Sequence, residues 1–379
     1  MSEASSHERV TKLTARSLGL APRDLIASLR SAIPSDLDAI VALRRRVLGP
    51  NVTWNDHDYL SWRYGLAPAS RSHATFHVLD VGGQILAGIG AERFDLNTPH
   101  GVAPAVCGMD ILADHSVRDT GVGPWLNLSL FRLHPIALAL GSNATSRGMV
   151  AQLYDTLHGR NVYHLPLDVK SFVHRHFRRR LVGSLYAALA DGVVRSRNRW
   201  LELTRRTGKV RVDNPRLLGT DIDREWSDES SNGPIGIRRS AAYLNWRFFR
   251  NPRAEYRALI GALQDRPTAL LVFRINDQAA DGPVMHLLDW WVRAPTDKGA
   301  FVAVLDAALV EARHRRVAYL SAAALGPIPG RLLQRAGFIR RYAFERTAAV
   351  HCVAKSVQRT LADSQNWNLT GLGDDSESP

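Results

Sequence analysis

An internal repeat is the feature that most constrains the fold of this 379-residue chain. The sequence YLSWRY at 59–64 returns as YLNWRF at 243–248, so both copies share the pattern Y-L-x-W-R-aromatic. Strand-like segments follow each copy, then an apolar strand that carries an aspartate, and then a D-x-G tripeptide that opens a helical pattern. Because these landmarks recur in the same order at nearly constant spacing, the chain should contain two structurally similar halves. Trp62 and Trp246 are interpreted as packing anchors.

A basic segment at 169–210 separates the two halves. Its apolar residues recur every four positions, which predicts one apolar stripe on a long helix. We favour a helical connector packed between the halves, and a helix lying in a membrane surface is the alternative. The first twenty or so residues and those after Leu372 are polar, and we expect them to be disordered. The stripe consists of Phe177, Leu181, Leu185, Leu189 and Val193.

Composition limits the classes of protein and site. The two cysteines, Cys107 and Cys352, form no CxxC pattern, which argues against a disulfide framework or a zinc–cysteine site. No apolar run is long enough for a transmembrane helix, and the polar N-terminus has no signal-peptide pattern, so we expect a cytoplasmic protein, with peripheral membrane contact still open. The net charge of +13 fits either an anionic partner or a solvated arginine-rich surface. No metal site is predicted, and the oligomeric state stays open.

The sequence RDTGVG at 118–123 follows the apolar strand 106–112 and precedes a helical pattern. The first N–H groups of a helix are unpaired and carry the positive end of its dipole, so they attract anions. Glycines let a phosphate approach the backbone, and Arg118 adds a cation. A dinucleotide-binding loop has the different spacing G-x-G-x-x-G, and no acidic residue ends a second strand at the expected distance.

With its aspartate-bearing strand, this loop resembles the acetyl-CoA pyrophosphate loop of the GCN5-related N-acetyltransferase (GNAT) superfamily. The GSNATS sequence at 141–146 resembles the start of the helix that flanks the pantetheine arm in that superfamily, and Leu153-Tyr154 its ending, although Gly159 is displaced by one place. The tandem repeat is similar to double-GNAT proteins. The resemblance implies acetyl-CoA or another acyl-CoA as cofactor. It implies these cofactor-binding residues: Val117, Arg118, Asp119, Thr120, Gly121, Val122, Gly123 and Asn143.

The resemblance implies an α/β (α+β) fold with two mixed, mostly antiparallel sheets flanked by helices. We place a GNAT-like acyl-CoA-binding domain at 23–168, the connector at 169–210, a degenerate GNAT-like domain at 211–350 and a C-terminal tail at 351–379. The second half has PTDKGA at 295–300 where the loop should be, so it keeps one glycine and lacks the arginine. We therefore expect a retained fold and a lost cofactor site in that half.

Four residues are candidates for acid–base chemistry, since in the GNAT mechanism an amine attacks the thioester while a base and an acid move protons. Asp110 lies on the strand before the loop, where partial burial should raise its pKa, and Glu92 lies on the preceding strand. His115 titrates near neutrality, and Tyr154 matches the position of the acid in the family. Each has a structural alternative: an arginine pair for either carboxylate, an ordinary loop histidine, and a core tyrosine.

The resemblance implies transfer of an acyl group to a small-molecule acceptor, an amine or a hydroxyl. A small amine, such as an amino-sugar or polysaccharide precursor, is the expected acceptor. A FemAB-like aminoacyl transferase that uses charged tRNA is the alternative, and the net charge suits it. A catalytically inactive GNAT scaffold that binds a partner is a third interpretation.

Overall fold

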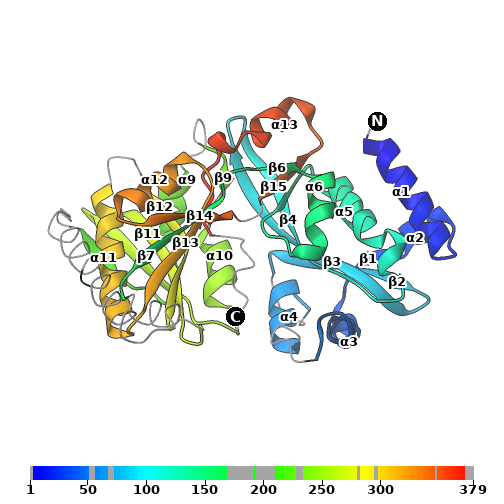
Figure 1. Cartoon of the computed structure of the whole chain (residues 1–379), viewed down its shortest axis with the longest axis horizontal. Coiled ribbons are helices and arrows are strands. Elements are labelled where there is room, and N and C mark those ends of the chain that lie inside the picture. Colours follow the sequence, from blue (N-terminus) through cyan, green and yellow to red (C-terminus); the bar gives the residue numbers. More distant parts are fainter. Residues whose placement is uncertain are drawn as a thin grey trace, which may run out of the picture.

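The computed structural model describes residues 3–50, 56–66, 72–168, 192, 210–227, 234–279, 282–293, 298–345 and 348–371. Two sheets lie side by side, each flanked by helices, as the sequence predicted (Figure 1). Apart from residues 192 and 210, the predicted connector at 169–210 lies outside the described residues. Within the described part of the chain, no helix is long and apolar enough to span a membrane.

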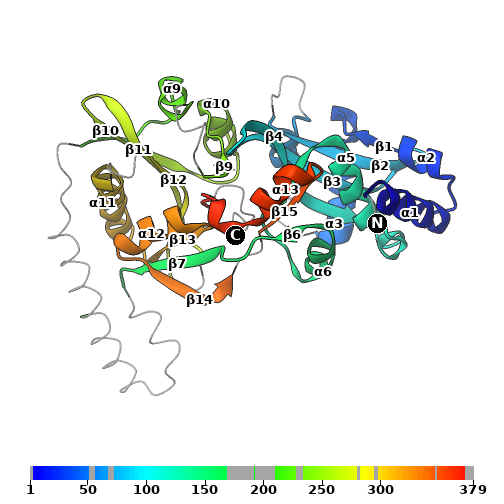
Figure 2. The same cartoon turned by 90° about the horizontal axis from the view of Figure 1, so that it is seen from above.

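The centre of the first sheet is a long hairpin formed by β3 (Gln84–Thr98) and β4 (Gly101–Ala113). Two helices, α3 (Leu37–Leu48) and α4 (His57–Tyr64), lie on one side of it, and α5 (Val122–Leu133) and α6 (Ala144–Leu153) lie on the other (Figures 1 and 2). All neighbouring strands are antiparallel except β4 and β5 (Ile136–Ala139). A short strand, β9 (Gly236–Ile237), pairs with β3. The order is β1 (Leu29–Ser31), β2 (Ala74–Val81), β3 (Gln84–Thr98), β4 (Gly101–Ala113), β5 (Ile136–Ala139), β15 (Ala349–Cys352) and β6 (Asp155–Thr156).

The second sheet repeats this arrangement with one parallel pair, β12 (Val284–Val292) and β13 (Tyr319–Ala324), in the equivalent place. Its main covering helix, α11 (Lys298–His314), buries Phe301, Val304 and Leu305 against the sheet. The remaining helices are α9 (Asp221–Ser227), α10 (Ala241–Leu244) and α12 (Pro327–Arg335). The strand order is β8 (Arg211–Asp213), β10 (Arg257–Leu263), β11 (Arg266–Asn276), β12 (Val284–Val292), β13 (Tyr319–Ala324), β7 (Asn161–Pro166) and β14 (Ile339–Glu345).

The two halves exchange one strand. β7 follows the first sheet in the chain, yet it pairs with β13 and β14 of the second sheet. Conversely, β15 pairs with β5 and β6 of the first sheet. The expected boundaries at 168 and 350 therefore do not separate the sheets, because each half completes its sheet with a strand from the other. Sequence patterns could not show this, since an apolar strand fits either sheet equally well.

The repeat also fixes how each copy begins. The Asp56 side chain accepts a hydrogen bond from the Tyr59 N–H at 2.7 Å, and the Ser240 side chain accepts one from the Tyr243 N–H at 3.1 Å. Both residues are N-caps three positions before the repeated tyrosine, and they satisfy an otherwise unpaired backbone N–H. In the first copy the helix is α4, and in the second a π-helical turn over Asn245–Phe249 continues α10.

The N-terminal end is more ordered than the sequence suggested, whereas the residues after Gly371 lie outside the described part of the chain. Residues Glu3–Ser17 form a helix, α1, that lies beside α5 (Figure 1). Its buried positions are His7, Thr11, Thr14 and Ala15, so its contact face is largely polar, which is why its sequence looked disordered. The predicted C-terminal tail at 351–379 contains the end of β15 and all of α13 (Lys355–Ala362), and Trp367 beyond them is fully buried.

Candidate functional site

The loop at 118–123 forms the entrance to α5. A 3-10 turn over Arg118–Thr120 leads to Gly121, whose φ of 84° is in the left-handed region, and α5 begins at Val122. A Cβ atom on Gly121 would lie 3.2 Å from the Thr14 hydroxyl oxygen, and the backbone conformation would be strained. The side chains of Val117 and Val122 are buried, while those of Arg118 and Asp119 are exposed. The loop therefore presents backbone N–H groups and an arginine at a helix N-terminus, an arrangement that suits a phosphate.

The two parallel strands beside this loop separate. β4 and β5 pair only at Val106↔Ala137 and Cys107↔Leu138, and β4 continues to Ala113. We call the space beyond these pairs the first-half gap. The register between β3 and β4 shifts at Gly88/Gly90, opposite Asp110, whose φ of 47° is also left-handed. A non-glycine residue with this φ is uncommon, and a bulge redirects the backbone groups of its strand.

Tyr154 ends α6 beside the point of separation. A Cβ atom on Gly108 would lie 3.5 Å from the Tyr154 hydroxyl oxygen, so this hydroxyl is next to the first residue of β4 beyond the pairs. The hydroxyl donates to the Asn127 side-chain oxygen at 2.9 Å, and the Asn127 amide donates to the Gly123 carbonyl at 3.1 Å. Burial raises the pKa of Tyr154 well above its ordinary value, and the neighbouring Cys107 adds to the shift. Tyr154 is thus neutral, and its hydroxyl is linked through Asn127 to the loop.

Asp110 has two partners from outside its own strand. Its carboxylate accepts a hydrogen bond from the Tyr64 hydroxyl at 2.5 Å and pairs with Arg44 at 3.1 Å, and 31% of the side chain is exposed. Burial alone would raise the pKa of Asp110, but Arg44 and Tyr64 outweigh it, so the pKa lies below its ordinary value. The expectation of a raised pKa was therefore wrong, because non-local partners stabilise the anion. Asp110 is a fixed, partly accessible negative charge beside the bulge.

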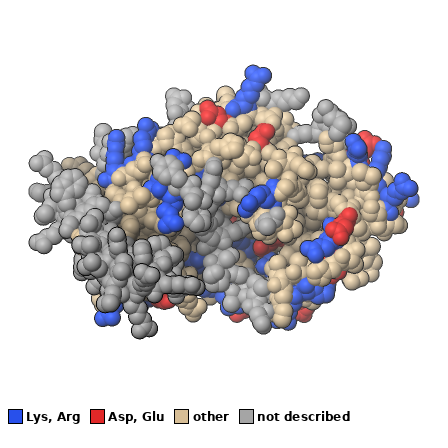
Figure 3. All heavy atoms as spheres, in the orientation of Figure 1, with Lys and Arg blue, Asp and Glu red and all other residues tan. Residues whose placement is uncertain are grey.

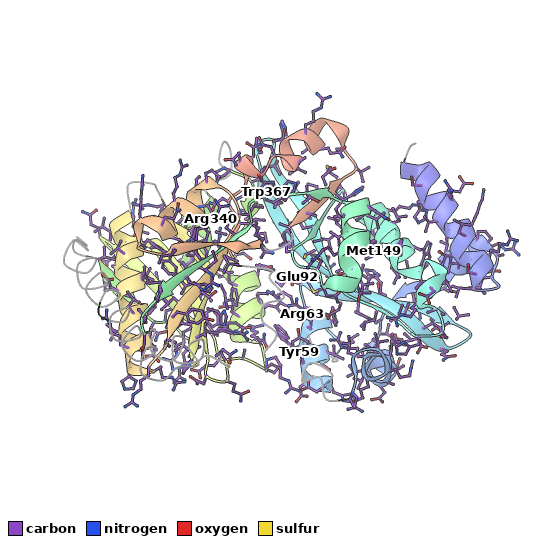
Figure 4. The ribbon with its side chains drawn as sticks, in the orientation of Figure 1. Tyr59, Arg63, Glu92, Met149, Arg340 and Trp367 are labelled. Carbon is purple, nitrogen blue, oxygen red and sulfur yellow. The ribbon has the colours of Figure 1, made fainter. Side chains whose placement is uncertain are left out.

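Glu92 lies at the boundary between the halves, next to Arg63 (Figure 4). Its side chain is 1% exposed, and it contacts Arg63 at 2.9 Å and Arg247 at 3.4 Å. The Tyr243 hydroxyl donates to it at 2.5 Å. Burial alone would raise the pKa of Glu92, but Arg247 and Arg63 outweigh it, and the pKa is lowered. Each half contributes the arginine of its repeat, so this carboxylate joins the halves and has no solvent-accessible side from which to reach an acceptor.

The other predicted residues lie at the edges of the site. His115 is exposed, and its Nε2 atom is 3.2 Å from the Arg46 carbonyl oxygen at the end of α3. Asn143 caps α6, because its side-chain oxygen accepts from the Ser146 N–H at 2.9 Å. Met149 of α6 approaches the loop, as a Cβ atom on Gly123 would lie 3.6 Å from its sulfur (Figure 4). The structure thus brings together the loop, Tyr154 and the strand gap.

Sequence reasoning missed Asn127, Thr14, Arg44 and Tyr64. Asn127 could have been found, because it is a polar residue within the apolar run WLNLSLF of α5. The others could not, since their partners are distant in the sequence.

In the part of the chain that the structure describes, neither the charges on the face in Figure 3 nor the metal-ligating side chains point to a nucleic-acid or metal site. Where side chains are described on the face in Figure 3, Lys and Arg are scattered among other residues and do not gather into one stripe. Among the described residues, no group of three or more His, Cys, Asp or Glu side chains is arranged to hold a metal ion.

Comparison with known proteins shows similarity in structure only. No protein-family model matches the sequence, and no curated protein matches it significantly. A GCN5-related N-acetyltransferase from Anabaena variabilis superposes with a TM-score of 0.58 at 10% identity, over 86% of this chain and 73% of that chain. A probable N-acyltransferase from Enterococcus faecalis gives 0.54 at 10% identity, over 86% and 72%. Saccharomyces cerevisiae N-myristoyltransferase with bound myristoyl-CoA gives 0.53 at 12% identity, over 92% and 89%.

These similarities extend over most of the chain, so they include both sheets. The prediction of the fold is confirmed: the chain has the GNAT fold in a tandem arrangement of two sheets flanked by helices.

Proposed function

We propose that this chain is an acyl-CoA-dependent acyltransferase whose cofactor site lies in the first half. One observation supports the proposal: the loop at 118–123, the Tyr154 hydroxyl and the first-half gap follow one another between the start of α5 and the bulge of β4. The pyrophosphate of CoA would bind the N–H groups at Gly121–Gly123 and Arg118. The pantetheine arm would enter the first-half gap, where parted strands offer unpaired backbone groups.

The chemistry would be direct transfer. The acceptor amine attacks the thioester carbonyl, the new C–N bond forms, the C–S bond breaks and the amine loses a proton. Backbone N–H groups at the β4 bulge would stabilise the developing oxyanion, and Tyr154 would donate a proton to the leaving thiolate. Asp110, which its lowered pKa keeps ionised, would attract and orient the ammonium form of the acceptor, whose proton would pass to solvent as the amine attacks.

The finer parts of the function extend the same proposal. We propose acetyl as the acyl group, a small amine such as an amino-sugar or polysaccharide precursor as the acceptor, and the cytoplasm as the location. The alternatives make different predictions. A tRNA-dependent aminoacyl transferase would bind charged tRNA with strong salt dependence. An inactive scaffold would bind CoA without turnover.

A thermal-shift screen separates these possibilities, because a ligand that binds only the native state raises the melting temperature. Acetyl-CoA, longer acyl-CoAs and tRNA would be compared at two salt concentrations. The proposal predicts a rise with CoA thioesters. A rise in melting temperature with tRNA alone would favour the tRNA-dependent aminoacyl transferase.

A further inference from the structure

The second half contains a strand gap that matches the first. β12 and β13 run parallel from Val284↔Tyr319 to Leu287↔Ala322, and no register joins them beyond that pair within the described residues. Asp289 follows on β12 two residues after the last pair, one place from the position that Asp110 occupies three residues after the last pair in the first half. We call the space beyond Leu287 and Ala322 the second-half gap.

The chain's own C-terminal segment, residues 366–371, enters this gap. Leu369 exchanges two backbone hydrogen bonds with Leu325, the residue directly after β13, at 2.9 and 3.1 Å. At the other side of the gap, a Cβ atom on Gly371 would lie 2.9 Å from the Leu288 carbonyl oxygen. The segment therefore reaches from the end of β13 to β12, across the space where the strands part.

Asp289, the aspartate at the second-half gap, is bound by the same segment. The Thr370 hydroxyl donates to Asp289 at 2.6 Å, and Arg239 pairs with the same carboxylate at 2.8 Å. Asp289 is 0% exposed and Thr370 is 1% exposed. In the first half, by contrast, Asp110 remains 31% exposed beside its own gap.

The fit leaves little free space. The Trp367 side chain is fully buried, and its indole N–H donates to the Leu361 carbonyl at 2.8 Å. Gly326 has a φ of 93°, and a Cβ atom there would overlap with the Trp367 carbonyl oxygen. Only glycine at this position lets the segment pass.

We infer that the second-half gap is a strand-binding cleft whose ligand is the chain's own C-terminal segment, held where a pantetheine arm would otherwise lie. Parted strands leave backbone N–H and C=O groups that need partners, and an extended chain with amide groups supplies them. The comparison with pantetheine rests on the proposed function. The occupation of the cleft by residues 366–371 does not.

The same segment ties the two sheets together. The Ile235 N–H donates to the Asn366 carbonyl, and the Asn368 N–H donates to the Ile235 carbonyl, both at 2.7 Å. Ile235 directly precedes β9, which pairs with β3 of the first sheet. Filling the second-half gap therefore stabilises the arrangement of the halves and blocks a second cofactor site.

Hydrogen exchange of the unmodified protein gives the first test. The amides of Leu325, Asn368 and Leu369 should exchange at least about 100-fold more slowly than unstructured amides, since Leu325 and Leu369 donate to each other within the cleft and Asn368 donates to Ile235. Exchange of these amides at the unstructured rate would overturn the inference.

Two glycine variants give the second test. Gly326→Ala should raise the exchange rates of Leu325 and Leu369 at least about tenfold, because the added methyl group displaces the segment. Gly101→Ala is the matched control, as its φ of 109° carries similar backbone strain but no atom lies within 4 Å of the new methyl group. Equal exchange in the two variants would contradict the inference. If Gly326→Ala does not fold, Thr370→Val is the variant to measure, because it removes only the hydroxyl that donates to Asp289. Unchanged exchange at Leu369 in Thr370→Val would contradict the inference.

Neither exchange measurement depends on CoA. If the chain failed to bind CoA while Leu369 was protected, the proposed function would fail and this inference would stand. If CoA bound once per chain while Leu369 exchanged freely, the proposed function would stand and this inference would fail.

Discussion

The indole rings of Trp62 and Trp246 stack with centroids 5.5 Å apart and 26° between their planes. Each indole N–H donates to the backbone carbonyl of the other residue, at 3.1 and 3.4 Å. The repeat that first indicated two halves is therefore the contact through which the halves meet. Arg63 lies over both rings, at 5.8 and 5.6 Å from their centroids, and also pairs with Glu92.

The tryptophan pair should be energetically coupled. Trp246→Ala, at a buried position, should lower the free energy of unfolding by about 3–5 kcal/mol. Trp62→Ala should cost less, because Trp62 is only half-buried. The double variant should cost about 1 kcal/mol less than the sum, since both changes remove the same contact. Urea unfolding measures this. Trp62→Ala combined with Trp125→Ala, in α5 on another part of the first half, should instead be additive.

Glu92→Gln should destabilise the protein by about 3–5 kcal/mol near neutral pH, because two buried arginines would lose their carboxylate. The folded-state pKa of Glu92 is lowered, so its contribution is present above the ordinary pKa and is lost as the pH falls through the folded value. The difference from the unmodified protein should therefore shrink in acid. Unfolding curves across pH test this. Glu255→Gln, at an exposed ion pair, serves as the control, and an equal effect of the two changes would refute the account.

Tyr154→Phe should lower kcat about 100-fold and leave the Kd for acyl-CoA unchanged, because the proton goes only to the leaving thiolate. An acyl donor with a more acidic thiol needs less protonation, so it should recover much of the lost rate. Tyr256→Phe, which alters a tyrosine of the second half, should have no such effect. The role of Tyr154 would be disproved by an equal loss of rate with both donors.

Asp110→Asn should lower turnover about 100-fold with unchanged acyl-CoA affinity. Because its pKa is lowered, Asp110 stays ionised above about pH 5, so it should give no acid limb in the rate profile between about pH 5 and pH 8. Asp114→Asn is the control, because Asp114 is a carboxylate just after β4 whose partners are the Ser116 N–H and Arg46, and these lower its pKa to about 2. Full turnover of Asp110→Asn would remove Asp110 from the mechanism.

The parts of the fold that local patterns determine could be predicted from the sequence. The repeat predicted two similar halves, and the glycines at 121 and 123 predicted the turn into α5. The helix α1 could not be predicted, because Thr11 and Thr14 on its buried face are polar and the usual apolar stripe is missing.

The surroundings of the candidate acid–base residues could not be predicted from the sequence either. The pKa of Asp110 depends on Arg44 and Tyr64, which are distant in the chain and approach only after folding. The exchange of β7 and β15 is likewise a choice between two similar sheets, and the residues of a strand do not encode which sheet it joins.

Titration calorimetry with acetyl-CoA tests the central claim most directly. The account predicts one site per chain, because the first-half gap is available and residues 366–371 fill the second. Gly121→Val should abolish this binding, since a β-branched side chain at a φ of 84° would strain the turn, crowd Thr14 and displace the N–H groups that would bind the pyrophosphate; circular dichroism checks that the chain stays folded. Two equivalent sites, or undiminished binding by Gly121→Val, would contradict the account.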